Sequence, residues 1–167
     1  YLKQIHRIGE STLIIYRIFI ADSISTEELT LSIKELTMSI LAAYCVPHPP
    51  LIIPAVGGGE EEKISDTIRA YQKVAREIAA LAPQTIILTS PHLPLYLDYF
   101  HICGGKRARG DLAKFGAPLE ALEVSYDEEL IRTLSLALAQ DSFPAGTQGE
   151  TSKELDHASF VPLHFIR

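Results

Sequence analysis

The segment IILTSPHLPLYLDYF, residues 86–100, decides the fold because an apolar run ends abruptly at a histidine set between two prolines. The run TIILTS at 85–90 has no polar alternation, which is typical of a strand covered on both faces. Proline fixes φ and removes an N–H donor, so Pro91 and Pro94 prevent the strand from continuing. The segment therefore predicts a buried strand that delivers His92 at its tip on a stiff stretch of chain.

A second apolar run and a long amphipathic segment precede that strand. SILAAYCV at 39–46 ends at Pro47 and is typical of another buried strand, although its length alone leaves a helix open. In the segment 57–83, three glutamates stand at the expected N-terminus, where they favour the positive end of a helix dipole. Its apolar residues recur at spacings of three and four and share one helical face: Ile64, Ile68, Tyr71, Ala75, Ile78 and Leu81. Strand, helix and strand predict a βαβ unit with a right-handed crossover.

The remaining residues predict further elements of an α/β class. A turn-rich stretch leads to Asp156, which can cap a final helical turn. The other expected elements are strands at 99–103 and 121–125, a glycine-rich basic loop at 104–110, and a helix at 127–140 with Asp127 as N-cap. Together the elements predict an α/β fold with a largely parallel or mixed central sheet.

Composition limits the classes of function. The 167 residues are 47% hydrophobic and 22% charged, which is enough apolar material for one packed core. A net charge of −6 argues against nucleic-acid binding, and we interpret the basic cluster at 106–109 as a solvated loop. No apolar run approaches the ~20 residues of a membrane-spanning helix. Cys45 and Cys103 lie far apart without a CxxC pairing, which indicates a reducing, cytoplasmic setting with neither a disulfide framework nor a zinc knuckle.

The first 37 residues differ from the remainder, and the chain's one methionine is Met38. Lys34-Glu35 can be encoded by AAGGAG, a bacterial ribosome-binding sequence, shortly before that methionine. We therefore interpret residues 1–37 as a translated upstream leader or flexible extension and residues 38–167 as the domain. The alternative is a genuine strand followed by a helix.

Two histidines follow the two predicted strands in similar surroundings. His48 lies in CVPHPP after the first strand, and His92 lies in SPHLP after the second. Ligands bind at the carboxyl ends of parallel strands, so we expect the two imidazoles to lie side by side at that edge. Neutral imidazoles are common metal ligands, and the pair predicts a metal site. Each could instead be a structural histidine of a turn.

The other histidines have different surroundings. His157 follows Asp156 at the junction of a polar loop and an apolar run, where an imidazole would be reachable by substrate and held by its neighbours, as acid–base catalysis requires. His101 and His164 lie within apolar runs, and we interpret them as hydrogen-bonded structural residues. His6 falls within the predicted leader.

Three separated motifs, PHPPLIIPAVGGGEE, TIILTSPHLPLYLDYF and LDHASFVPLHFI, resemble in order and spacing the LigB-like family of class III extradiol ring-cleavage dioxygenases. The resemblance runs from about residue 39 to residue 167, and the branch it is most similar to is the AmmeMemoRadiSam system protein B group, to which the Memo proteins are related. It implies a three-layer α/β/α fold and oxidative opening of a catechol-type ring by O2. It also implies that His48 and His92 bind Fe(II), or another divalent metal, and that His157 is the acid–base catalyst.

The implied chemistry agrees with the residue types. A site of two histidines and one carboxylate leaves coordination positions open, so a catecholate and O2 could bind the same ion. His157 could take a catechol proton and return it later. The implied partners are a small aromatic substrate and O2, with a second copy of the chain or AmmeMemoRadiSam proteins as protein partners. The alternative function is a non-enzymatic, Memo-like protein that binds metal or a peptide. A zinc hydrolase has less support, because no HExxH motif occurs.

The third metal ligand of the family, a glutamate or in some Memo-type relatives a cysteine, lies nearer the C-terminus. No glutamate of the matched region stands in an equivalent motif, so the sequence resembles the N-terminal portion of a longer domain. We therefore expect weak Fe(II) binding by residues 1–167 alone, with Asp98 and Asp156 as the carboxylates to test. We also expect the apolar run 160–166 to be exposed.

Overall fold

The computed structural model describes residues 12–17, 40–93, 95–149 and 154–167. Its larger sheet has four strands in the order β2-β1-β5-β4, and each neighbouring pair is antiparallel. A smaller sheet pairs β3 with β6 in parallel. The strands are β1 (Thr12–Arg17), β2 (Thr85–Ser90), β3 (Phe100–His101), β4 (Arg107–Leu112), β5 (Ala117–Tyr126) and β6 (Ala145–Gly146).

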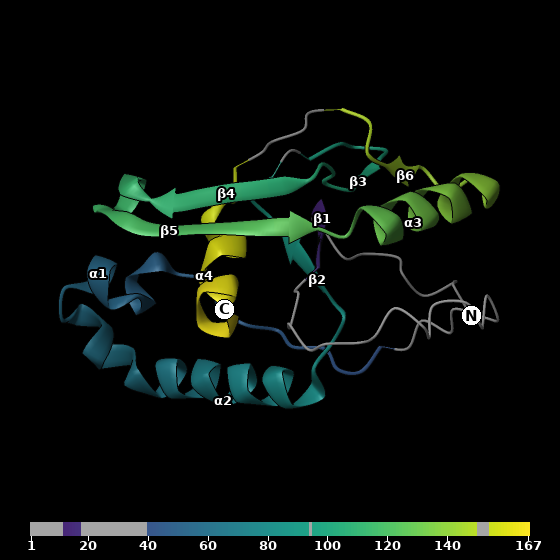
Figure 1. Cartoon of the computed structure of the whole chain (residues 1–167). Helices are drawn as coiled ribbons and strands as arrows, with labels where there is room; N and C mark the ends of the chain where they lie inside the picture. Colours follow the sequence, from purple (N-terminus) through teal and green to yellow (C-terminus); the bar gives the residue numbers. More distant parts are fainter. Residues whose placement is uncertain (1–11, 18–39, 94, 150–153) are drawn as a thin grey trace.

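Helices complete the fold, and α4 lies between the four-stranded sheet and α2 (Figure 1). The α-helices are α1 (Pro54–Gly57), α2 (Ser65–Leu81), α3 (Glu128–Gln140) and α4 (His157–Ile166). Short 3-10 segments are η2 (Pro50–Ile52), η3 (Glu60–Ile64) and η4 (Ala113–Phe115). The structure confirms the α/β class, with an antiparallel four-stranded sheet and a parallel two-stranded sheet. Within the described part of the chain, no helix is both long and apolar enough to cross a bilayer.

The helices predicted from periodicity and capping are confirmed. Asp127 accepts a hydrogen bond from Leu130 N at the start of α3, and Asp156 accepts one from Ser159 N at the start of α4. The apolar stripe of α2 turns Tyr71 into the core. The start of α2 differs from the expectation, because the three glutamates at 60–62 belong to η3.

The predicted strand at 39–46 is wrong for its described residues. Residues 40–46 form neither helix nor strand and are mostly exposed. β1 pairs instead with β2 along all six residues, from Thr12↔Ser90 to Arg17↔Thr85. β1 runs antiparallel to β2 and forms its backbone hydrogen bonds in place of the predicted strand. The described residues therefore do not form the predicted parallel βαβ unit. β2 is also less covered than predicted, because Ile87 is 49% exposed.

The segment interpreted as a leader therefore contains a described strand, β1, at the place where the alternative interpretation expects one. Residues 1–11 and 18–39 lie outside the described residues. The division into residues 1–37 and 38–167 stays a prediction.

The basic segment at 106–109 is not a solvated loop, because it runs into β4. Ala108 is buried between Arg107 and Arg109, whose side chains lie on the exposed face of the strand. Arg107 pairs with Glu123 of β5 across that face. Alternation of apolar and charged residues is typical of a strand that has one face buried and the other in solvent. Predicted strand 99–103 shortens to β3, and predicted strand 121–125 lengthens to β5.

The C-terminal apolar run is buried, which corrects the expectation of an exposed patch. Phe160 and Val161 are fully buried, and Leu163 nearly so. They are covered because α4 packs against α2 on one side and against β2 and β4 on the other. Phe165 stacks on Tyr71 of α2 with ring centroids 4.5 Å apart. α4 is therefore the central helix of the core.

Candidate metal centre

Three histidines from distant parts of the chain meet at one site. The Nε2 atoms of His48 and His92 lie 3.1 Å apart. The ring of His157 lies 4.4 Å from that of His92 and 5.6 Å from that of His48, between centroids. One nitrogen of each ring can be chosen so that all three lie within 4.8 Å of one another. The structure thus brings together the three histidines that the sequence analysis selected.

The segment that bears His48 is held from both sides. The Tyr71 hydroxyl of α2 donates a hydrogen bond to the carbonyl oxygen of Pro47. Downstream, Ile52 and Ile53 are buried in the core. Prolines at 47, 49 and 50 restrict the backbone between these anchors. His48 therefore has a fixed position although its segment belongs to no strand.

A hydrogen-bond network joins His92 to the start of α4. The Ser90 hydroxyl, at the end of β2, accepts from the backbone N–H of His92 at 3.2 Å and donates to Asp156 Oδ2. Asp156 Oδ1 accepts from Ser159 N at 2.9 Å and so caps the helix that begins at His157. One carboxylate therefore fixes two of the three histidines relative to each other.

The start of α4 is also tied to the sheet. Leu155 N donates to the carbonyl oxygen of Arg109 in β4 at 3.0 Å, directly before Asp156. Gly110 allows this approach, since a Cβ at that position would lie 2.6 Å from Leu155 Cβ. A larger residue at Gly110 would push the His157 segment away from β4.

Burial lowers the pKa of His157, the neighbouring His92 and His48 lower it further, and the Asp156 carboxylate opposes them. A lowered pKa keeps the imidazole neutral at neutral pH, with a nitrogen lone pair free to bind a metal or a proton. The ring is partly exposed at a cavity of about 620 Å³ that is also lined by His48 and Cys45.

Phe115 of η4 is a residue of this site that sequence reasoning missed. Its ring packs against His157 with centroids 5.4 Å apart in a T-shaped contact. The residue lies in the turn between β4 and β5, and nothing in the local pattern marks it as part of a site. Its contact with the start of α4 is a tertiary one, between the turn that joins β4 to β5 and a helix more than forty residues later.

The other candidates lie elsewhere. His101 is buried and its Nδ1 contacts the carbonyl oxygen of Gln148 at 3.2 Å, in keeping with a structural role. His164 lies 3.5 Å from Glu120. Asp98 is exposed and joins no described metal-ligand cluster. Both cysteines are free, and burial, with a smaller effect of Asp156, raises the pKa of Cys103 to about 11.

Comparison with known proteins identifies the family of this chain. Residues 42–167 match the family described as the catalytic LigB subunit of aromatic ring-opening dioxygenase. The chain belongs to the LigB family. It is 34% identical over 136 residues to the protein CA_C1420 of Clostridium acetobutylicum, an alignment that covers 77% of this chain and 29% of that protein. The chain thus spans less than a third of the length of this curated relative. No solved structure matches the chain.

The histidine cluster of this LigB member fits a divalent metal ion. Two nitrogens bound to one ion at ~2.0–2.1 Å and at angles near 90–110° lie roughly 3 Å apart. The 3.1 Å separation of His48 and His92 Nε2 agrees with that value. No carboxylate joins the histidines in the described residues, since Asp156 is engaged with Ser90 and Ser159. The expected carboxylate ligand is therefore not identified in this part of the LigB chain.

Asp156→Ala should weaken both the fold and the metal site. The variant loses an N-cap, which costs ~0.5–2 kcal/mol of unfolding free energy, and the partner of Ser90. Since residues that orient metal ligands change affinity ~10–100-fold, we expect a loss of that size in metal titrations. The matched control is Asp127→Ala, because Asp127 caps α3 and accepts from Thr85 at the other end of β2. It should lose similar stability and keep metal affinity; equal affinity losses in both variants would contradict the orienting role.

Proposed function

We propose that this LigB chain is part of a non-haem Fe(II)-dependent extradiol dioxygenase that opens a catechol-type aromatic ring with O2. The observation that supports it is the convergence of His48, His92 and His157 within 4.8 Å, in a member of a ring-opening dioxygenase family. We further propose a cytoplasmic location, in keeping with two free thiols.

In this proposal His48 and His92 bind the metal and His157 moves protons. Bound Fe(II) would supply the redox chemistry and the open positions at which substrate oxygens and O2 meet. The lowered pKa of His157 leaves its ring unprotonated at neutral pH. A ring nitrogen is therefore free to accept a catechol hydroxyl proton. Asp156 holds that ring in place through the helix cap, and Phe115 offers an aromatic edge beside it.

A non-enzymatic, Memo-like role is the second candidate. It rests on the resemblance of the three histidine-bearing motifs to the Memo-related branch of the family. In that case the same cavity would bind metal or a peptide without turnover. We also propose, from the same resemblance, that the protein partners are AmmeMemoRadiSam proteins or a second copy of this chain.

Oxygen consumption distinguishes the two candidates. The product of the complete gene, loaded anaerobically with Fe(II), should consume one O2 per catechol opened when mixed with a panel of catechols, and a yellow ring-opened product should form. The Zn(II)-loaded protein is the control, because zinc has no accessible redox change. Stoichiometric Fe(II) without O2 uptake across the panel would contradict the dioxygenase and support the Memo-like role.

A further inference from the structure

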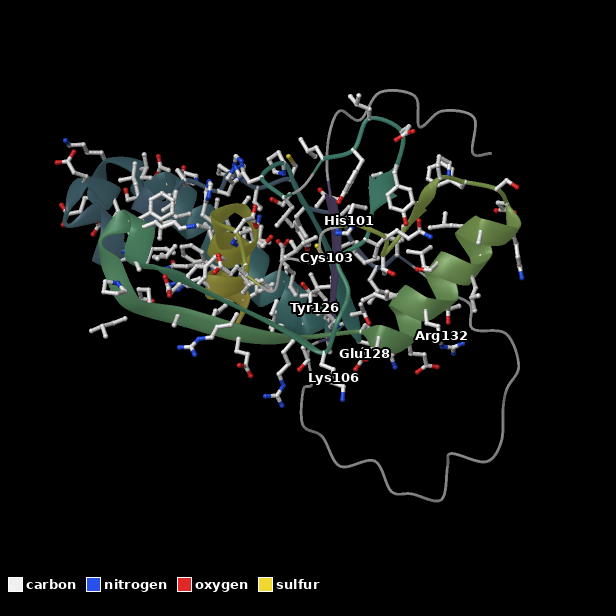
Figure 2. The ribbon with its side chains drawn as sticks, turned by 90° about the horizontal axis from the view of Figure 1, so that it is seen from above. His101, Cys103, Lys106, Tyr126, Glu128 and Arg132 are labelled. Atoms are coloured by element: carbon white, nitrogen blue, oxygen red, sulfur yellow. The ribbon has the colours of Figure 1, made fainter. Side chains whose placement is uncertain are left out.

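A second cavity, of about 630 Å³, lies apart from the histidine cluster and shares no lining residue with the first cavity. Its walls are residues 104–106, Arg107 at the start of β4, the first turns of α3 and Thr147. Figure 2 shows Lys106 beside the start of α3, with Glu128 and Arg132 along the same edge of the molecule. Its size is within the range of sites for small organic ligands.

The charge of this cavity is opposite to that of the chain. The chain has a net charge of −6, but the cavity is lined by more positive than negative side chains. These are the cations Lys106, Arg107 and Arg132 and the carboxylate of Glu128. Arg107 is paired with Glu123. Neither Lys106 nor Arg132 forms an ion pair with any residue that the structure describes. Two unpaired cations at one cavity can form charge-assisted hydrogen bonds with an anionic ligand.

Neutral donors complete the lining. No described residue accepts a hydrogen bond from the backbone N–H of Gly104 or Gly105. Gly105 has φ +130°, which side-chain-bearing residues rarely adopt, and a Cβ on Gly104 would press against the Thr147 methyl at 3.3 Å. Neither glycine N–H group is therefore committed to an acceptor in the described part of the chain. Ser135 of α3 adds a hydroxyl that is buried and has no partner among the described residues.

From these groups we infer that the second cavity binds the phosphate group of a small phosphomonoester. A tetrahedral dianion can accept hydrogen bonds from an ammonium, a guanidinium, backbone N–H groups and a hydroxyl at once, whereas a planar carboxylate has fewer acceptor directions. The cavity is larger than one phosphate, and its remaining walls hold Ile131, Leu136 and Glu128. Glu128 would accept from a hydroxyl of the ligand body. The inference does not rest on the dioxygenase proposal, because no histidine of the cluster takes part.

Calorimetric titration of the metal-free chain with glycerol 3-phosphate tests the inference, with glycerate as the carboxylate counterpart. We expect saturable binding of the phosphate ester and much weaker binding of glycerate. Lys106→Gln and Arg132→Gln should each weaken binding about tenfold or more, since each removes a charged hydrogen-bond donor. Arg76→Gln, which removes an exposed cation of α2, should leave affinity unchanged.

The inference would be overturned by no saturable binding of glycerol 3-phosphate, by equal binding of glycerate, or by equal losses in Arg76→Gln and the two cavity variants. His92→Ala distinguishes the two cavities. It disrupts the histidine cluster at the first cavity and should leave phosphate affinity unchanged. A loss of phosphate binding in His92→Ala would assign the phosphate to the first cavity and contradict the second.

Discussion

In the product of the complete gene, His92→Ala is expected to abolish stoichiometric Fe(II) binding, whereas His157→Ala should retain the metal and lose turnover. His92 Nε2 lies 3.1 Å from His48 Nε2, and removing one member of that pair leaves the ion a single strong nitrogen ligand there. His157 is assigned to proton transfer, and general acid–base contributions are ~10²–10⁴-fold in rate. Metal content after anaerobic loading and O2 consumption measure the two effects separately.

Far-UV circular dichroism should stay unchanged in His92→Ala, because that side chain is exposed and supports no core contact. His164→Ala is the matched control, since His164 lies on α4 like His157 but outside the histidine cluster. Loss of metal in both His92→Ala and His157→Ala, but not in His164→Ala, would make His157 a third ligand and contradict its assignment as the base.

Local signals predict the helices and the three histidines. The spacing in α2 and the caps Asp127 and Asp156 involve residues within one or two helical turns, where sequence determines structure directly. His48 and His92 stand out because prolines surround them, and that restraint is local too. Their meeting is predicted as well, but from a parallel pairing of 39–46 with 85–90 that the described residues do not form.

The pairing of β2 could not be predicted because it depends on distant segments. Residues 12–17 and 40–46 are both apolar runs able to pair with a buried strand, and periodicity does not rank them. In the structure β1 takes the place beside β2, while Tyr44 of the other run contacts Glu77 on α2. His48 reaches the site through the Tyr71 contact to Pro47, a tertiary interaction with no sequence pattern.

Phe160→Ala is expected to lower the free energy of unfolding by ~3–5 kcal/mol, the usual cost of removing a fully buried phenylalanine. Domains of this size have total stabilities of ~5–15 kcal/mol, so the variant should unfold at markedly lower urea. The physical reason is the place of α4 between α2 and the sheet, where a lost ring leaves a cavity that neither side can close. Urea unfolding followed by circular dichroism measures the change.

Phe143→Ala is the matched control, because Phe143 follows α3 and its side chain is 51% exposed. It should cost less than ~1 kcal/mol, since little apolar area is lost there. If Phe160→Ala cost no more than Phe143→Ala, the C-terminal run would not be packed as described, and the exposed patch expected from sequence would be correct instead. The comparison also bears on the metal site, because Phe160 lies on the first turn of the helix that begins at His157. A destabilised α4 should therefore weaken metal binding as well, whereas Phe143→Ala should leave it unchanged.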